Sequence, residues 1–419
     1  MQPETSLRDD VLGRIAELGT ADLIVGIPTY NSEATVAGVM RAVNEGLERH
    51  YPDLRALLFV SDGGSLDDTR ERAQQVKSAK VPRIIAIYRG LPGKGTSLRA
   101  VFEAGVRLGV RACAVFDSDL RSITPEWVRG LLDPVLVGGH DFVSPFYVRH
   151  KYDATITNHL AYSLTRALYG KRVRQPIGGD FGFSRRAIEF FTREAVWDTD
   201  VAKFGIDIWM TTVALTEGFR VCESWLGAKV HDPKDPGASL GPMFRQVVGT
   251  LFGMMSRTER VWRAVRGSEP VPLLGTPAAV DPPPVEISLE RLVLNFRTGL
   301  AHFGSLWREV LGPDQFDGIA RLADAEPGAM RMDPRLWART VYDFAATYHR
   351  WARDRYKLVE IMTPLYYGRV AAFAQETRDM TTEEAEELVV EPQAERFEEE
   401  KPYLLSRFRS WDAVPISEE

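Results

Sequence analysis

The fold is decided by one stretch of the sequence, Ala112-Cys113-Ala114-Val115-Phe116-Asp117-Ser118-Asp119. Its first five residues are apolar and predict a buried β-strand, which ends in two carboxylates, Asp117 and Asp119. Ligands of open α/β sheets bind beyond the carboxyl ends of the strands. Mg²⁺ binds a few carboxylates together with phosphate oxygens, so this strand end could hold a cation and a nucleotide. An Asp-x-Asp alone is also typical of a strand end followed by a helix cap, and the surrounding sequence has to decide.

The segments around this stretch predict a mostly parallel sheet with helices on both faces. Apolar strands are predicted at 23–28, 56–60 and 83–88, and each is followed by a helical segment. This alternation is typical of parallel α/β sheets. Two further strands are predicted at 141–147 and 221–231. The fold class that we predict is therefore α/β.

The chain divides into four predicted segments. A helical lead-in over 1–20 precedes an α/β catalytic domain over 21–268. A Pro-rich linker follows over 269–285, and a helical C-terminal domain with an acidic tail covers 286–419. We interpret the acidic region 382–400 as a solvated helix face or tail.

The composition excludes several classes of function. Of the 419 residues, 44% are hydrophobic and 26% are charged, and the net charge of −6 argues against general nucleic-acid binding. Two cysteines, Cys113 and Cys222, make no disulfide framework and predict core residues of a cytoplasmic protein. The chain has no run of about 18 apolar residues, so we expect no transmembrane segment. The first residues, Met1–Thr5, lack the features of a signal peptide.

Several short motifs, taken in order, resemble the GT-A nucleotide-sugar glycosyltransferases. Within that family the chain is most similar to the mannosylglycerate synthases and more distantly similar to the glucosyl-3-phosphoglycerate synthases. The likeness covers roughly residues 22–235. The motifs that carry it are Pro28 to Glu33, Pro92-Gly93-Lys94-Gly95, Asp117-Ser118-Asp119, Gln175-Pro176-Ile177-Gly178-Gly179, Gly205-Ile206-Asp207 and Lys229-Val230-His231.

The resemblance implies a site for a nucleotide-sugar donor, a GDP- or UDP-hexose. Lys94 lies between two glycines, which let the backbone fold tightly so that the ammonium can reach a phosphate or the sugar. Lys94 and Asp207 are the implied catalytic residues, with Asp207 near the sugar hydroxyls or the acceptor. The implied donor-binding residues are Pro28, Tyr30, Asn31, Glu33, Ser61, Asp62, Lys94, Asp117, Ser118, Gly178 and Gly179.

The resemblance also implies a divalent metal, Mg²⁺ or Mn²⁺. Asp119 and His231 are the expected ligands, and Asp117 is expected to contact the ribose, or the metal through water. A neutral imidazole suits Mn²⁺ better than Mg²⁺. A single histidine is more often structural, but His231 ends a predicted strand close to Asp119.

The acceptor side matches the mannosylglycerate synthases through Arg149, Asp153 and Thr157. An arginine offers a planar fork to a carboxylate, and Asp and Thr can bind hydroxyl groups. These residues could instead form a helix N-terminus with Asp153 as its cap. The segment 232–236 departs from the family pattern, which leaves the acceptor open. Four basic residues could form a phosphate pocket or could be solvated charges: Lys151, Lys171, Arg172 and Arg174.

We therefore expect a metal-dependent, retaining transfer of mannose or glucose to D-glycerate or a similar small hydroxy-acid, which makes a compatible solute such as mannosylglycerate or glucosylglycerate. Transfer to 3-phosphoglycerate is one alternative, and an inverting transferase with Asp207 as general base is another. A regulator that binds sugar nucleotides without turnover is a third.

The C-terminal half suggests how the chain associates. Arg369 lies in the apolar helical stretch 358–373, and a buried arginine seldom stays unpaired, so we expect the helical domain to pack on the catalytic domain and the chain to form a homodimer. An apolar stripe could be a core face, a dimer contact or a membrane-binding surface. Its members are Phe244, Val247, Val248, Leu251 and Phe252.

Overall fold

The stretch that ends in Asp117 and Asp119 begins with β4 (Ala112–Val115), an interior strand of an eight-stranded sheet. The structure is a computed structural model that describes residues 5–78, 80–231 and 241–410. The strand order is β10-β8-β5-β7-β4-β1-β2-β3. The other strands are β1 (Leu23–Thr29), β2 (Ala56–Asp62), β3 (Arg83–Ile87), β5 (Phe142–Val148), β7 (Phe181–Ser184), β8 (Val221–Ala228) and β10 (Leu273–Leu274).

The sheet is mostly parallel, as predicted, with one exception. Strand β7 runs antiparallel to both of its neighbours, β4 and β5. The remaining pairs are parallel, including β1 with β2 and β4. Parallel strands have their carboxyl ends at the same edge of a sheet, so β1, β2, β4 and β8 deliver their following loops to one edge.

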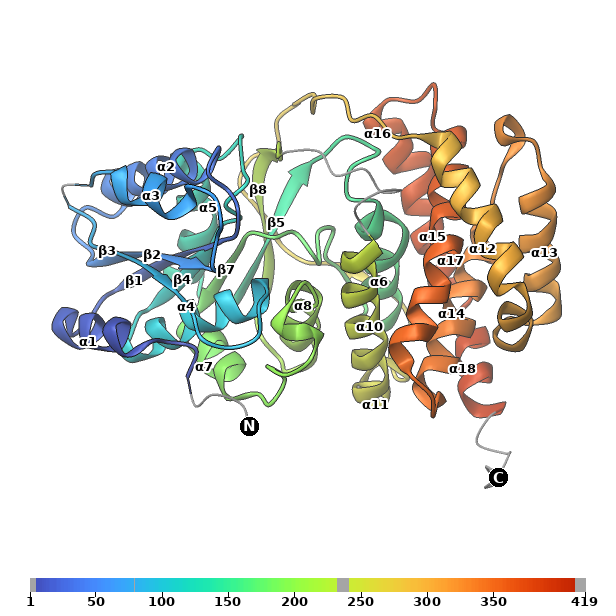
Figure 1. Ribbon diagram of the computed structural model, residues 1–419, viewed down its shortest axis with the longest axis horizontal. Helices are drawn as coiled ribbons and strands as arrows, with labels where there is room; N and C mark the ends of the chain where they lie inside the picture. Colours follow the sequence, from blue (N-terminus) through green and yellow to red (C-terminus); the bar gives the residue numbers. More distant parts are fainter. Residues whose placement is uncertain (1–4, 79, 232–240, 411–419) are drawn as a thin grey trace. The chain divides into compact units, whose positions relative to one another are not determined.

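Helices cover both faces of the sheet because alternate residues of β1 point to opposite sides (Figure 1). Leu23, Val25 and Ile27 are fully buried in the core with α2 and α5. Gly26 faces α4, where a β-carbon would lie only 2.6 Å from Val101, so the helix packs directly on the strand. The helices are α1 (Asp9–Leu18), α2 (Val36–His50), α3 (Thr69–Gln75), α4 (Lys94–Leu108), α5 (Pro125–Leu136), α7 (Arg185–Arg193) and α8 (Ile206–Thr216).

The chain forms two compact units whose segments alternate along the sequence. The sheet unit consists of residues 1–149, 173–232 and 270–283. The helical unit consists of residues 150–172, 233–269 and 284–419. The predicted domains were consecutive ranges, whereas these units exchange segments. Part of the predicted linker is itself structured, because β10 pairs in parallel with β8.

The helical unit is built around α15, a helix with a proline in its interior. Gly299 allows α12 to approach Pro364 closely, and the Trp307 indole N–H donates to the carbonyl of Ile361 at 2.9 Å. The Trp307 contact fixes α12 to α15 in the turn that precedes the proline. The helices are α6 (Tyr162–Tyr169), α10 (Gly241–Arg257), α11 (Glu259–Trp262), α12 (Leu289–Val310), α13 (Pro313–Asp324), α14 (Pro334–Arg350), α15 (Arg355–Glu376), α16 (Thr382–Ala385), α17 (Glu391–Glu399) and α18 (Lys401–Ser410).

The acidic region 382–400 has the solvated helix face that we predicted, with five of its glutamates exposed, but its other side is buried. It forms α16, a π-helical turn at Glu386–Val390 and α17, and α17 packs against α6 and α14. Ala394 and Phe397 of α17 are fully buried. The glutamates project from a helix whose apolar side belongs to the core, which the charge pattern alone did not indicate.

The apolar stripe on α10 is a core face, so the membrane-binding alternative is wrong. Phe244, Val248 and Phe252 are fully buried, and Phe244 stacks on Tyr366 with ring centroids 4.6 Å apart. No helix in the described part of the chain is both long enough and apolar enough to cross a membrane. Cys113 and Cys222 are free and buried, which confirms that they are core residues.

Candidate active site

A chain of alternating charges lies at the carboxyl end of β4 in the sheet unit. The Asp117 carboxylate bonds through Oδ1 to the Lys94 ammonium at 2.8 Å and through Oδ2 to the Lys229 ammonium at 3.1 Å. Lys94 also pairs with Asp207 at 3.2 Å, and Lys229 pairs with Asp180 at 2.9 Å. We call these five residues the lysine cluster. Three carboxylates share two lysines, so the cluster has one more carboxylate than ammonium group.

Asp117 is the fixed anion of this cluster. Burial by itself would raise the pKa of Asp117, but the charges of Lys94 and Lys229 hold it well below its usual range. Gly179 has a φ of 92° and no β-carbon, and an added one would collide with the Asp117 carboxylate. The predicted Gly178-Gly179 pair therefore serves this site through its backbone. The Gly179 carbonyl accepts from Lys94 at 3.2 Å, and the Gly178 carbonyl accepts from Lys229 at 2.8 Å.

Lys94 begins α4 in a tight turn, as its two glycine neighbours predicted. Gly93 has a φ of 157°, and a β-carbon there would lie 2.7 Å from the backbone of Lys203. A β-carbon on Gly95 would collide with the carbonyl of Val201. The glycines thus let the backbone run directly against the segment that leads into α8, which carries Asp207.

Asp207 lies in the first turn of α8 and is only 7% exposed. Its Oδ2 accepts from Lys94, and its Oδ1 has no hydrogen-bond partner among the described residues. Burial raises the pKa of Asp207, although the nearby Lys94 charge opposes this. A buried oxygen without a partner is costly, so this carboxylate is suited to bind a hydroxyl group or to accept a proton.

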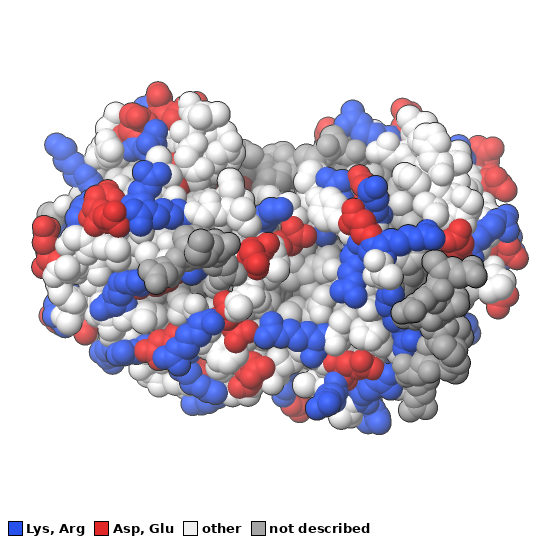
Figure 2. Space-filling view, turned by 60° about the horizontal axis from the view of Figure 1, so that its bottom comes forward, with Lys and Arg blue, Asp and Glu red and all other residues white. Residues whose placement is uncertain are grey.

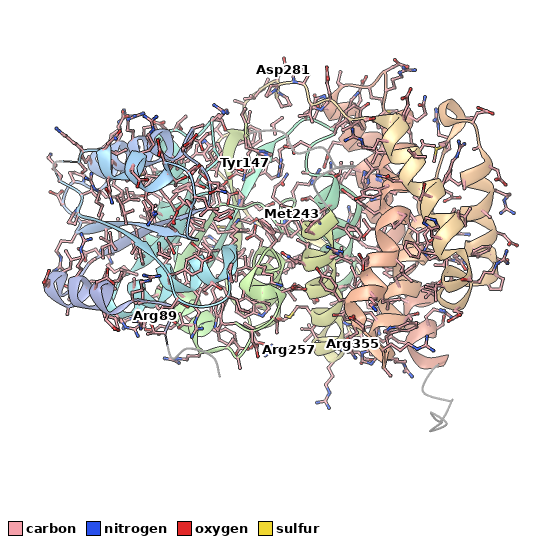
Figure 3. All side chains as sticks on the ribbon, in the orientation of Figure 1. Arg89, Tyr147, Met243, Arg257, Asp281 and Arg355 are labelled. Carbon is pink, nitrogen blue, oxygen red and sulfur yellow. The ribbon has the colours of Figure 1, made fainter. Side chains whose placement is uncertain are left out.

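Two members of the lysine cluster were not on our predicted site. Lys229 was noted only as part of a motif, and Asp180 was not singled out. Asp180 is fully buried, and its Oδ1 accepts the backbone N–H of Asp117 at 2.7 Å. Tyr147 of β5, labelled in Figure 3, donates its hydroxyl to the other oxygen of Asp180. The sequence carried one signal for Asp180, since it is an acidic residue that follows two glycines and directly precedes a strand.

The two predicted metal ligands come from segments that the fold brings together. Leu120 and His231 form an antiparallel bridge, and the backbone N–H of Arg121 donates to the carbonyl of Val230 at 2.9 Å. The residue after Asp119 is therefore paired through its backbone with His231, and the convergence of the Asp119 and His231 side chains stays a prediction. The described residues contain no group of three or more His, Cys, Asp or Glu that could hold a metal ion. A carboxylate and an imidazole nevertheless form a suitable donor set for a cation that takes its other ligands from phosphate oxygens and water.

His231 also has a cationic neighbour. Its Nε2 lies 3.0 Å from Nη2 of Arg149. A guanidinium can only donate, so Nε2 presents its lone pair to the arginine. The same lone pair would bind a metal, and a bound metal would therefore displace this contact.

The predicted donor loops are held by buried polar side chains. Asp62 is fully buried and accepts from the Thr29 hydroxyl at 3.0 Å and from the backbone N–H of Ser65 at 2.9 Å. The Ser61 hydroxyl donates to the carbonyl of Ser97 at 3.0 Å. In the structure these two predicted donor-binding side chains shape the loops. Their role toward a nucleotide stays a prediction.

Other predicted donor residues lie closer to solvent. Tyr30 is 59% exposed, and Asn31 has a φ of 49° while its side chain accepts from the backbone of Leu66 at 2.9 Å. Glu33 accepts from the backbone of Asp68 at 3.0 Å. The aromatic ring of Tyr30 is thus presented by a braced loop, which suits stacking on a nucleobase.

Ser118 and Pro28 complete the predicted donor set. The Ser118 hydroxyl lies 2.8 Å from that of Ser32, which joins the loop after β1 to the loop after β4. Pro28 is buried within β1 and pairs in register with Ser61 of β2. Both residues therefore connect neighbouring strand ends.

The predicted acceptor residues fall in different units. Arg149 follows β5 in the sheet unit, where it contacts His231. Asp153 and Thr157 belong to the helical unit. The Asp153 carboxylate accepts from the backbone of Ala154 at 2.9 Å, and Thr157 begins a π-helical turn, Thr157–Ala161. The grouping of these three residues around one acceptor stays a prediction.

Three of the four basic residues considered for a phosphate pocket are engaged within the helical unit. Lys151 donates to the carbonyls of Thr377 and Met380 near the end of α15, at 2.6 and 2.5 Å. Lys171 pairs with Glu269, and Arg172 donates to Ser268 at 3.2 Å. These contacts favour a structural role for all three. The face in Figure 2 shows basic and acidic side chains interspersed.

Residues 24–197 match the sequence family described as Glycosyl transferase family 2. No curated protein matches the chain. Among solved structures, a glucosyl-3-phosphoglycerate synthase from Mycobacterium tuberculosis, in complex with Mg²⁺ and uridine diphosphate, is 25% identical with a TM-score of 0.45, over 57% of this chain and 83% of that chain. A mannosyl-3-phosphoglycerate synthase from Rubrobacter xylanophilus is 21% identical with a TM-score of 0.43, over 60% of this chain and 79% of that chain.

The same Mycobacterium tuberculosis enzyme in complex with Mn²⁺, uridine-diphosphate-glucose and phosphoglyceric acid is 25% identical with a TM-score of 0.45, over 60% of this chain and 86% of that chain. At such TM-scores the likeness is partial, and it identifies neither the donor nor the acceptor of this chain. The family match and the observed sheet confirm the predicted fold class, an α/β domain of the GT-A type with a helical C-terminal region.

Proposed function

We propose that this chain, whose residues 24–197 match Glycosyl transferase family 2, is a nucleotide-sugar-dependent hexosyltransferase. A hexose, mannose or glucose, is transferred from a GDP- or UDP-sugar to D-glycerate or a similar small hydroxy-acid. The observation that supports this best is the backbone pairing of Leu120, the residue after Asp119, with His231. Asp119 and His231 each lie two residues along the chain from a member of the lysine cluster, Asp117 or Lys229, at the edge where strand ends bind ligands. A cation site next to a lysine and an unpartnered carboxylate suits a diphosphate and a sugar.

The donor is bound along the ends of β1, β2 and β4. Tyr30 stacks on the base, and the braced loops after β1 and β2 surround the ribose. Asp119 and His231 are the residues that would hold a divalent cation. That cation supplies charge stabilisation for the leaving diphosphate when it is bound. Lys94 is the second positive group for the phosphates or the sugar, and it has a flexible stem that can move toward them.

The acceptor is oriented by its carboxylate. Arg149 binds the carboxylate as a planar fork, and Asp153 with Thr157 binds the hydroxyl groups. In the retaining reaction the acceptor hydroxyl attacks from the face that the diphosphate leaves, and a leaving phosphate oxygen accepts its proton. Asp207 binds the sugar hydroxyls through its free Oδ1 and orients the ring. Transfer to 3-phosphoglycerate is less well supported, because Lys151, Lys171 and Arg172 are engaged elsewhere.

Asp207 also favours a second candidate, an inverting transferase. Burial raises its pKa, and its Oδ1 has no partner among the described residues, which are the properties of a general base. In that mechanism Asp207 removes the proton of the acceptor hydroxyl as it attacks from the opposite face. The anomeric configuration of the product, measured by NMR, separates the two mechanisms.

One experiment tests the proposal: GDP- and UDP-linked mannose and glucose, each offered with glycerate, 3-phosphoglycerate and related acids, with Mg²⁺ or Mn²⁺. We expect transfer from one nucleotide class to glycerate or a close hydroxy-acid, with loss of turnover on chelation. Transfer only to 3-phosphoglycerate would establish the alternative acceptor. Nucleotide binding without turnover on any acceptor would favour a regulator. The homodimer also stays a prediction, and light scattering on the purified chain checks it.

A further inference from the structure

Lys229 has no donor group left for a substrate. It follows β8, and its side chain is only 3% exposed. An ammonium has three N–H donors, and this one has three oxygen acceptors: Asp117 at 3.1 Å, Asp180 at 2.9 Å and the Gly178 carbonyl at 2.8 Å. Its nitrogen also lies 5.1 Å from the ring centre of Tyr147. Any effect of Lys229 on a donor must therefore pass through the groups that it holds, Asp117, Asp180 and the backbone of Gly178.

Asp180 holds Asp117 by a second route. One of its oxygens accepts the backbone N–H of Asp117, and the other accepts from Lys229 and from the Tyr147 hydroxyl. The Tyr147 ring packs against Trp127 with centroids 5.1 Å apart. Both the backbone and the carboxylate of Asp117 are thus fixed from the buried side.

The opposite side of Asp117 is open by comparison. Its side chain is 23% exposed, and its Oδ1 is paired with Lys94, whose own side chain is 12% exposed. If Lys94 turned toward a phosphate, Asp117 would lose one of its two counterions. Lys229 would remain at 3.1 Å, so the carboxylate would keep one counterion and stay in place.

We propose that Lys229, Asp180 and Tyr147 are positioning residues that hold the Asp117 carboxylate and neutralise it while Lys94 transfers its contact to the donor. This inference rests on the proposed function, because it assumes a donor with a diphosphate. It assigns Lys229 the role of a permanent internal counterion and Lys94 the role of an exchangeable one. The two lysines of the cluster therefore have different tasks.

The test uses the full chain with two variants. Lys229→Met removes the ammonium but keeps much of the side-chain volume. Lys229→Met combined with Asp180→Asn removes one positive and one negative charge, so the buried pair is replaced without an unpaired charge. Arg129→Met is the matched control, because Arg129 forms an exposed pair with Asp133 at 2.8 Å in the same unit.

We expect Lys229→Met to raise the donor KM roughly tenfold or more, with the acceptor KM unchanged, and to lower Tm. The double variant should recover Tm to near that of the wild type, while the donor KM stays raised at least about fivefold. A crystal structure of the double variant should show the Asp117 carboxylate turned from its present rotamer. Arg129→Met should change neither the donor KM nor Tm.

Two results would overturn the inference. In the first, the double variant recovers both Tm and the donor KM. Lys229, Asp180 and Tyr147 would then only satisfy one another inside the protein and would not position Asp117. In the second, Asp117 keeps its rotamer and the donor KM is unchanged in a folded Lys229→Met protein. Failure of the proposed function looks different, since the wild type would then transfer no sugar. In that case the Asp117 rotamer in the double variant still decides the positioning role.

Discussion

Two ionic clusters, one in each unit, use different cations for different purposes. In the sheet unit, Lys94 and Lys229 connect three aspartates, and Asp117 and Asp207 face the proposed ligands. In the helical unit, Arg166 is 4% exposed and pairs with Glu391 at 2.7 Å, with Glu395 at 3.6 Å and with Glu398. We call this second group the arginine cluster.

The difference lies in the mobility of the charges. A lysine ammonium is a compact charge on a flexible stem, so it can change partners, whereas a guanidinium fixes several partners in one plane. The arginine cluster joins α6 to α17: both carboxylate oxygens of Glu391 accept hydrogen bonds, from Tyr162 and Arg166, and Oε1 of Glu398 accepts from Arg166 and Ser268. The lysine cluster contains the unpartnered Oδ1 of Asp207. We infer that the arginine cluster is structural and that the lysine cluster belongs to the active site. The following variants test that distinction.

The largest effect is expected next to the lysine cluster, at the proposed cation site. Asp119→Ala or His231→Ala should lower turnover by at least about 100-fold, because loss of the cation removes several kcal/mol of charge stabilisation. Steady-state kinetics with added Mn²⁺ measure this, and circular dichroism should show an intact fold. Near-normal turnover in both variants after chelator treatment would remove the cation from the mechanism.

Arg149 tests whether an arginine can also serve the site, because it belongs to the sheet unit, which carries the lysine cluster. Arg149→Ala should raise the acceptor KM roughly 30-fold, since losing a charge-assisted pair costs about 2 kcal/mol or more. Arg149→Lys should recover only part of this, because lysine lacks the fork. Donor affinity measured by calorimetry should stay the same. An equal loss of donor affinity would instead place Arg149 on the diphosphate, which its contact with His231 makes geometrically reasonable.

Arg166→Met tests the arginine cluster directly. Its glutamate partners are partly exposed, so we expect a loss of about 2 kcal/mol in the free energy of unfolding, less than for a fully buried pair. Transfer kinetics of the folded variant should be unchanged. Denaturant unfolding followed with kinetic assays checks both points. A selective change in kcat at full stability would contradict the structural assignment.

Glu223 should affect stability alone and leave transfer kinetics unchanged, and its effect on stability depends on pH. Burial raises its pKa to about 8, although it accepts the backbone N–H of Arg174 at 2.6 Å. In the unfolded chain the pKa of a glutamate carboxyl is about 4.3. Between that pH and about pH 8 the folded protein therefore holds one proton more than the unfolded chain. Its contribution to stability is therefore complete below the unfolded pKa and is lost as pH rises toward 8, by at most about 1.4 kcal/mol per pH unit.

Glu223→Gln keeps an oxygen acceptor and removes the titration. The stability of the variant relative to the wild type should therefore increase between pH 5 and pH 8. Urea unfolding at several pH values measures this difference. A constant difference across that range would show that Glu223 does not titrate there.

The sequence predicted the parts of the site that sit in short motifs. The apolar strand before Asp117 and the carboxylate pair were visible in one stretch, and His231 ended a predicted strand. Lys94 was marked by its glycines, whose close backbone contacts the structure bears out. These signals are local, so one sequence is enough to read them.

The rest depends on which segments meet. Asp180 and Lys229 act only because antiparallel β7 places Asp180 beside Asp117, and no local pattern specifies that neighbour. The buried side of the acidic region 382–400 could not be predicted from its charge pattern, because it is carried by scattered apolar residues such as Phe397. The alternating units were missed for a similar reason, since hydrophobic periodicity shows that α6 needs a partner but not that α17 is that partner.

The most direct test of the account is a calorimetric titration of GDP and of UDP into the wild-type chain, with Mn²⁺ and then with chelator. The account predicts that one nucleotide binds with Mn²⁺, that binding weakens by at least about tenfold on chelation, and that His231→Ala abolishes the difference. Binding that is equally tight with and without the cation, or no binding of either nucleotide, would contradict the proposed donor site.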